Sequence, residues 1–351
     1  MAQFVDWDLA AATAKTLGKG GPEISLAEAT EVVAELRGLI DDAAGHVNEF
    51  AKLTPKVAHH PVRVVDRGDW AGVNVEGLQK VINPLADKLT GGREMSGLSA
   101  MIGPRLTGVQ AGTVLAYLSG RVLGQFEVFS SDPGELLLVA PNIVDTERKL
   151  EVVPHDFRLW VCLHEVTHRS QFTAVPWMRG YFLQEVQAFA DAAQAGTDQL
   201  ADRLRAALSA LTDSIRNPDS RASVLDIVQT PAQRVIVERL TALMTLLEGH
   251  AEFVMDGVGP EVVPTVEEIR QRFNKRRESH NPIERMVRRL LGIEMKMRQY
   301  AEGHKFVQTV VERVGIDEFN RVWDSPDTLP TTAEIADPDA WITRVPGTSP
   351  A

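Results

Sequence analysis

The residues Leu159–His168, which read LWVCLHEVTH, decide how the rest of the chain is interpreted. An apolar run leads into two histidines and a glutamate, a pattern typical of a buried helix with a polar cluster on one face. Asp156, behind Pro154, is the predicted N-cap of this helix. Pro176 ends the pattern, because a proline ring cannot continue a helix.

A helix would place His164 and His168 one turn apart on the same face. Two imidazoles at this spacing can bind one zinc ion, and Glu165 beside them can take a proton from a water molecule at the metal. The alternative is that both histidines make ordinary hydrogen bonds within a helical core. Hydrophobic packing alone does not require such a polar cluster, so the pattern favours a metal site.

The composition is that of a soluble globular protein, with 351 residues, 44% hydrophobic and 24% charged. The formal net charge of −11 argues against general binding to nucleic acids or to anionic membranes. No signal peptide and no run of about 18 apolar residues is visible, so we expect a cytoplasmic protein. The single cysteine, Cys162, fits a reducing compartment, and its apolar surroundings predict an inert, buried thiol.

Several helices are predicted before the histidine motif. A short helix over about 5–18 ends at a glycine-rich turn, and Ser25 then caps a second helix, with Glu28 completing a capping box. A further helix is predicted over 73–89. Glycines spaced between Gly103 and Gly124 predict a helix packed tightly against another element, with the histidine-bearing helix as a candidate partner.

Two short strands are predicted at 125–129 and 136–139, joined by a turn, whereas 62–70 is either a short extended piece or a loop. A strand edge next to a zinc helix can pair with an extended peptide. Asn142 could also face such a cleft. His46 and the pair His59–His60 could be further ligands, although surface or turn positions are the simpler interpretation.

A zinc site of this type needs a third protein ligand, which leaves the fourth position for water. Helical patterns follow at 181–195 and 197–215, and Thr230-Pro231 opens a strong helix to about 256. In that helix Glu248 lies among apolar neighbours, where a carboxylate is costly unless it is paired or bound to a metal. Three other residues compete for the same role: Glu185, Glu252 and His250.

A resemblance favours Glu248. The segment Glu248-Gly-His-Ala251 resembles the Glu-Gly-x-Ala segment of gluzincin metallopeptidases, in which the first glutamate binds zinc from a second helix. The chain also resembles the actinobacterial zincin-like metallopeptidase family of hydrolases, some members of which carry a label of association with deazaflavin-coenzyme biosynthesis. The matching segments are Val5–Leu9, Leu163–His168, Leu247–Ala251, Lys296–Tyr300 and Phe319–Trp323. Glu248 follows His168 by 80 residues (248 − 168), a wide spacing that keeps Glu185 open.

The region from Val266 to Arg298 is rich in lysine and arginine, but glutamates are interleaved. A solvated, salt-bridged helix face is therefore a simpler interpretation than a nucleic-acid patch. Zinc peptidases commonly stabilise the oxyanion with a Tyr, His or Arg, so Tyr300, His304 and Arg298 are candidates, with Tyr300 preferred. The proline-rich tail is expected to wrap the surface with Trp341 docked.

Together these patterns predict a mainly α fold with a small β component, implied by the resemblance to be zincin-like with helical elaborations. We expect one domain over 1–351, divisible into a lobe with the strands and the zinc helix (1–175) and a helical lobe with the third ligand (176–351). The predicted function is that of a zinc-dependent metallohydrolase, and specifically a peptidase that cleaves amide bonds. His164, His168 and Glu248 would bind Zn2+.

We expect the protein to bind a peptide or a small amide as its substrate, and we expect no binding to nucleic acids or membranes. One alternative is a catalytically silent zincin-like protein whose structural zinc site serves partner binding. A structural site is closed by four protein ligands, so His250 or Glu185 as fourth ligand would favour that alternative. A helical binding protein without metal is a further alternative.

Overall fold

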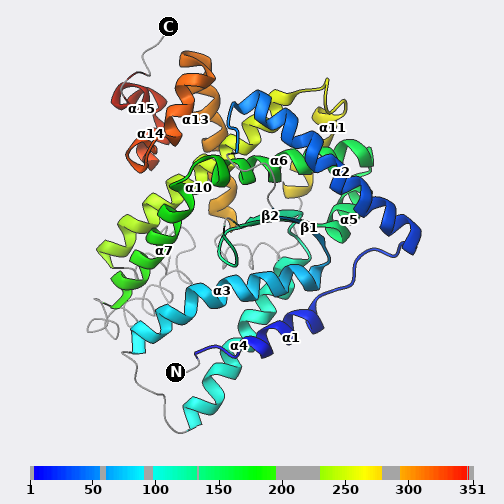
Figure 1. Ribbon diagram of the computed structural model, residues 1–351, viewed down its shortest axis with the longest axis vertical. Coiled ribbons are helices and arrows are strands. Elements are labelled where there is room, and N and C mark those ends of the chain that lie inside the picture. The colour runs from blue at the N-terminus through cyan, green and yellow to red at the C-terminus, as the bar shows by residue number, and fades with distance from the viewer. Residues whose placement is uncertain are drawn as a thin grey trace, which may run out of the picture.

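A small sheet lies among helices in the computed structural model, which describes residues 4–55, 61–90, 98–132, 134–194, 230–278, 293–345 and 347 (Figure 1). The central strand is β3, Glu135–Val139. It pairs in parallel with β1, Val62–Val65, and antiparallel with β2, Gly124–Glu127. β2 is therefore an edge strand of this sheet. The predictions of β2 and β3 are confirmed, and the segment left open at 62–70 contains β1.

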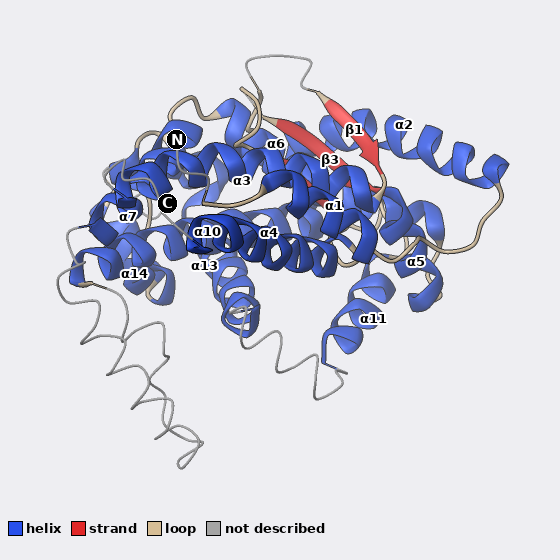
Figure 2. Cartoon of the chain, turned by 90° about the horizontal axis from the view of Figure 1, so that it is seen from below, coloured by secondary structure: helices blue, strands red, loops and turns tan. Residues whose placement is uncertain are grey.

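The two faces of β3 are buried in different apolar clusters, because successive side chains of a strand point to opposite sides of the sheet. Leu136 and Leu138 belong to the cluster that includes α6, whereas Leu137 and Val139 belong to the cluster formed with α1, α3 and α4. All four side chains are fully buried. Helices thus cover both faces of the sheet (Figure 2).

Helices account for most of the described chain, which confirms the prediction of a mainly α fold with a small β component. None of the described helices is long and apolar enough to cross a membrane. In chain order, the helices are α1 (Trp7–Leu17), α2 (Leu26–Ala51), α3 (Arg67–Thr90), α4 (Leu98–Ser119), α5 (Ala140–Leu150), α6 (Pro154–Ala174), α7 (Met178–Gln194), α10 (Pro231–Val258), α11 (Val266–Glu278), α13 (Ile293–Phe319), η2 (Asn320–Trp323), η3 (Pro326–Thr328), α14 (Thr332–Ala336) and α15 (Pro338–Arg344).

The ends of the first two helices agree with the predictions from the sequence, with one exception. α1 ends at Gly18, and the Ser25 hydroxyl accepts a hydrogen bond from the Glu28 backbone N–H at the start of α2 (3.1 Å). The predicted second half of the capping box is wrong. The Glu28 carboxylate instead accepts a hydrogen bond from Arg148 of α5 (2.6 Å). A tertiary ion pair has replaced the local bond.

The glycine-rich helix α4 packs against α1, not against α6 as expected. A Cβ added at Gly108 would overlap the Asp6 carbonyl, and one added at Gly112 would overlap the Ala10 carbonyl. The prediction of close packing is therefore confirmed, with α1 as the partner of α4, whereas Gly124, which belongs to β2, is the glycine that meets α6. Spacing of small residues shows that a helix approaches another backbone, but it does not identify that backbone.

The start of α6 differs from the prediction. Val153 is its N-cap and Pro154 its first residue, and Asp156 lies within the first turn. The Asp156 carboxylate accepts hydrogen bonds from the backbone N–H and the hydroxyl of Thr265 (2.9 and 2.7 Å). Asp156 is thus wrong as a cap because a distant residue binds its side chain, while Pro154 starts the helix.

The second half of the chain follows its predicted caps closely. Thr230 is the N-cap of α10 and Pro231 its first residue, as predicted, and Gln233 adds a capping box. Trp341 is fully buried in the tail, which folds as η3, α14 and α15. The predicted helix at 197–215 lies outside the described residues, as does the pair His59–His60. The larger apolar cluster includes residues of both predicted lobes, and the division into lobes stays a prediction.

Candidate metal centre

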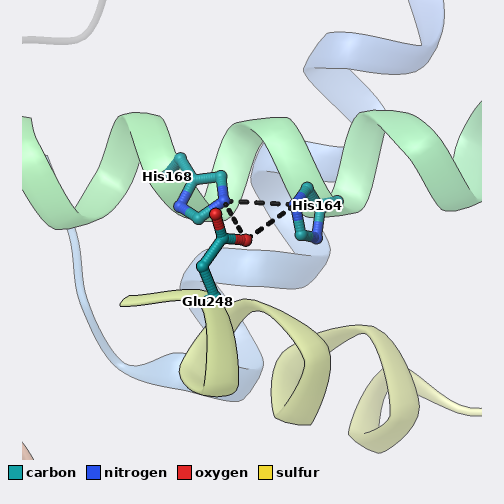
Figure 3. Close-up of side chains that lie close together, drawn as sticks. All are labelled: His164, His168 and Glu248. Carbon is teal, nitrogen blue, oxygen red and sulfur yellow. Dashed lines mark hydrogen bonds and ion pairs between the residues drawn. The ribbon is translucent and has the colours of Figure 1, made fainter. Parts of the chain in front are cut away.

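α6 carries the two histidines of the motif through the centre of the core. Its apolar residues are buried on several sides, against α2, α10 and the sheet. Cys162 is free and fully buried, and burial raises the pKa of its thiol, as expected for an inert cysteine. With one side of α6 turned toward α10, His164 and His168 point their rings into the space between the two helices (Figure 3).

Glu248 reaches the same space from α10. Leu247 and Ala251 beside it are buried, so the apolar stripe of α10 holds the helix against α6 and leaves Glu248 aimed at the two rings (Figure 3). Its Oε2 lies 3.6 Å from His164 Nε2 and 3.4 Å from His168 Nε2. The two Nε2 atoms are 3.1 Å apart.

These three donors fit a zinc ion. In a tetrahedral shell with bonds of about 2.1 Å, neighbouring donor atoms lie about 3.4 Å apart. The observed separations of 3.1, 3.4 and 3.6 Å agree with that value. Two imidazoles and one carboxylate are also a common donor set of catalytic zinc sites. Among the described residues, His164, His168 and Glu248 form the group whose ligand atoms all lie close enough to share one ion.

The charges around the donors also favour a cation. Burial opposes the charging of His168, but Glu248, Glu165 and the hydrogen bond with Gln171 together outweigh it and raise the pKa of that imidazole to about 9. Burial raises the pKa of Glu165 to about 8, against the effect of His168. The Glu248 carboxylate therefore stabilises positive charge placed beside it in this partly buried site.

Glu165 lies between α6 and the edge strand β2. A Cβ added at Gly124 would lie 2.6 Å from Cδ and 2.8 Å from Oε1 of Glu165, so only glycine leaves room for this carboxylate. The side chain is buried. A buried carboxylate beside two histidines has the placement of a general base.

Each histidine also has a partner for its other ring nitrogen. His164 Nδ1 lies 3.1 Å from the Met255 sulphur, and His168 Nδ1 lies 2.9 Å from Oε1 of Gln171. Because a thioether and an amide oxygen can only accept, both rings are held with Nδ1–H and with Nε2 toward Glu248.

The competing ligands predicted from the sequence have other contacts. The Glu185 carboxylate, on α7, accepts two hydrogen bonds from Arg239 (2.8 and 3.1 Å). His250 is fully buried against Phe319, and burial lowers the pKa of its imidazole to about 3. Neither belongs to the cluster, and neither does Glu252.

Two further predicted positions have no place in the cluster. The Asn142 side chain donates to the carbonyls of Ser119 and Val122 (2.7 and 2.6 Å), which fixes α5 to the end of α4. His46, on α2, is likewise absent from the group of ligands.

The candidates for an oxyanion donor lie on α13. Tyr300 and Arg298 belong to this helix, but their side chains lie outside the described part of the chain. His304 is described and lies 3.2 Å from Asp256, which also pairs with Arg270. On α11, Arg270 pairs with Asp256 and Arg272 pairs with Glu268, as expected for a salt-bridged face.

Sequence reasoning missed three features that hold this site. Gly124 makes room for Glu165, Gln171 binds His168, and Gly249 of α10 contacts Gly303 of α13. Gly124 was the last glycine of the stretch predicted to pack closely and directly preceded a predicted strand, so a signal of close approach was available. Gln171 lies three residues after His168 on the same helix face, a spacing that could have been noticed.

Comparison with known proteins places the chain in a family. No curated protein matches it. A solved structure from Chloroflexus aurantiacus, described as "a putative hydrolase with a novel fold", is similar over 97% of this chain and 98% of its own, at 28% identity and a TM-score of 0.71. The model of the zincin-like metallopeptidases matches residues 5–342. Because that match covers nearly the whole sequence, the chain belongs to the zincin-like metallopeptidase family.

Proposed function

We propose that the protein is a zinc-dependent hydrolase that cleaves peptide bonds. The observation that carries the proposal is the convergence of His164, His168 and Glu248, at separations of 3.1–3.6 Å, beside the buried carboxylate of Glu165. The family and the similarity to a protein described as a hydrolase support the same reaction class.

The three ligands and Glu165 have separate roles in this proposal. A zinc ion bound by His164, His168 and Glu248 would supply Lewis-acid chemistry, lowering the pKa of a water molecule and polarising the substrate carbonyl. Glu165 would accept the proton of the attacking water and pass it to the leaving amine. Its buried position on α6, next to His164 in the chain and against Gly124 of β2, suits a general base.

The edge strand β2 provides a place for an extended substrate. β2 pairs with β3 on one side, and Gly124 brings its backbone against Glu165. An extended peptide can add to such an edge through main-chain hydrogen bonds, which would present a peptide bond beside Glu165. Substrates with a peptide backbone therefore fit better than small amides.

Tyr300 is the proposed oxyanion donor. α13 crosses α10 where Gly303 meets Gly249, the residue after Glu248, and Tyr300 lies one helical turn before Gly303. A phenol at that level would donate to the oxygen that gains negative charge.

The association with deazaflavin-coenzyme biosynthesis and the cytoplasmic location of the protein stay predictions.

The catalytically silent alternative requires a fourth protein ligand. The two candidates for it, His250 and Glu185, are bonded to Gln171 and Arg239, respectively. We therefore propose that no protein residue fills the fourth ligand position of the zinc ion, which would be taken by water.

The test is the variant Glu165→Gln, which keeps size and hydrogen bonding but cannot accept a proton. We expect it to bind zinc at the wild-type level, measured by elemental analysis, and to lose cleavage of a mixed-sequence library of quenched fluorescent peptides. Glu185→Gln is the matched control and should keep both properties. Turnover retained in Glu165→Gln contradicts the role of Glu165. Zinc-loaded wild type that cleaves no peptide in the library contradicts the peptidase function and favours the silent alternative.

A further inference from the structure

One fully buried amide connects the two ligand-bearing helices. Gln171 lies on α6 three residues after His168, and its side chain has no exposed surface. Its Oε1 lies 2.9 Å from His168 Nδ1, and its Nε2 donates to the backbone carbonyl of Leu247 on α10 (2.8 Å). The same nitrogen lies 3.0 Å from Nδ1 of His250.

These partners determine where the hydrogens are. The Leu247 carbonyl can only accept, so the amide nitrogen of Gln171 must face it, and the amide oxygen must face His168. That oxygen also can only accept, so His168 Nδ1 carries a hydrogen. In a neutral imidazole the other nitrogen then keeps its lone pair, and this is the nitrogen nearest to His164 Nε2 and Glu248.

The same amide fixes the spacing of the ligands across the two helices. Leu247 immediately precedes Glu248, so the hydrogen bond to its carbonyl ties the backbone beside the third ligand to the helix of the first two. His250, on the next turn of that backbone, is packed against Phe319 and Trp323 with ring centroids 5.7 and 5.3 Å away. The amide is thereby anchored on both sides and cannot rotate without breaking buried hydrogen bonds.

We infer that Gln171 is a positioning residue of the metal site, holding His168 with Nδ1–H and Nε2 toward the ion and holding Glu248 at ligand distance. The inference rests on the proposed metal site and adds a residue that does not touch the ion. A partner of this kind raises metal affinity because it removes the ring rotations and the wrong tautomer that would compete with binding.

Three variants test the role. Gln171→Met keeps the volume but removes both hydrogen bonds, and we expect its zinc Kd, measured by competition with a chromophoric chelator, to rise about 10–100-fold. Gln171→Glu keeps an acceptor for His168 and should bind zinc more tightly than Gln171→Met. The matched control is Gln233→Met, a second buried glutamine of the same chain, whose Oε1 accepts from the Thr230 backbone N–H, away from the ligands. It should lose stability and keep the wild-type Kd.

A second measurement does not depend on metal. The hydrogen on His168 Nδ1 should give a slowly exchanging NMR signal in the metal-free wild type, whether the ring is neutral or charged, and that signal should be lost in Gln171→Met. If folded Gln171→Met keeps the wild-type zinc affinity and the ring signal of His168, the role of Gln171 is overturned and the proposed metal site is not. A wild type that binds no zinc overturns the metal site, and with it this role of Gln171, even where the ring signal is present.

Discussion

Glu165, His168 and Glu248 are ionisable side chains held in an interior that is mainly apolar. Glu165 is 6% exposed, and Leu163 and Val166 near it on α6 belong to the main apolar cluster. Burying such groups is unfavourable unless each finds an opposite charge or a metal ion. The neighbouring carboxylates raise the pKa of His168, so the site already favours positive charge. A divalent cation satisfies all of these groups at once, which is the physical reason to expect one.

Gly124→Ala should impair turnover without removing the metal. The added Cβ would lie 2.6 Å from Cδ of Glu165, so the carboxylate must move while the three ligands keep their positions. A displacement of the base by about 1 Å can cost about 100-fold in rate. We expect a loss of about 10–100-fold in kcat on a cleaved peptide, with zinc content unchanged.

Gly120→Ala is the control for that substitution, because a Cβ there meets no atom within 4 Å. It should leave both turnover and zinc content at wild-type levels. Full activity in Gly124→Ala would show that Glu165 does not act from its position against β2.

Among the elements, α10 and α13 cross so closely at Gly249 and Gly303 that there is no room for a Cβ on either residue. A Cβ added at Gly303 would overlap the Thr245 carbonyl, and one added at Gly249 would overlap the backbone of Gly303. Alanine is normally the better helix former, so Gly303→Ala would be expected to stabilise a helix seen in isolation. Here overpacking reverses the sign, and we expect a loss of about 3 kcal/mol in the free energy of unfolding.

Chemical denaturation of Gly303→Ala beside Gly72→Ala measures this effect. Gly72 of α3 has no atom within 4 Å of an added Cβ, so its substitution should be neutral or stabilising by up to about 1 kcal/mol. Equal stability of the two variants would contradict the close crossing. Because Gly249 adjoins Glu248, Gly303→Ala should also weaken zinc binding.

The last two helices are joined by a charged pair whose effect depends on pH. Burial disfavours the charge of Glu334, but hydrogen bonds from Arg344 and Thr331 outweigh it and lower the pKa of the carboxyl. A folded-state pKa below the unfolded value of about 4.5 stabilises the fold above pH 4.5, and this stabilisation is lost as the pH falls through the folded-state pKa. Glu334→Gln should therefore lower Tm at pH 7, and the difference from wild type should shrink below pH 4.5. A difference in Tm between the two proteins that stays constant from pH 7 to pH 3 would contradict a stabilising role of the ionised Glu334.

Elements with local signals were predictable from the sequence. Thr230 and Pro231 mark the start of α10 by their positions within one turn, and the histidine spacing defines one face of α6. Asp156 was misassigned because its side chain is bound by Thr265, 109 residues away, and no local pattern reports such a partner. The same limit explains why Gly108 predicted a close approach but not α1 as the partner.

In the whole molecule, the proposed metal ion would join parts of the chain that are far apart in sequence. His168 and Glu248 are separated by 80 residues (248 − 168), yet α6 and α10 pack side by side within the larger apolar cluster. An ion bound by both helices exists only in the folded state, because the unfolded chain holds these ligands too far apart to share it. Binding free energy then adds directly to folding free energy.

Zinc should consequently raise the stability of the entire fold. At free zinc about 1,000-fold above its Kd, the free energy of unfolding should increase by about 4 kcal/mol, seen as a higher Tm than in the presence of EDTA. Glu248→Ala should lose most of this increase, because it lacks the ligand from α10, whereas Glu185→Ala should keep it, because Glu185 is bound to Arg239. Calorimetry of the three proteins with and without zinc makes the comparison. An increase lost in Glu185→Ala and kept in Glu248→Ala would move the third ligand to α7, and no increase in wild type would rule out a metal that bridges α6 and α10.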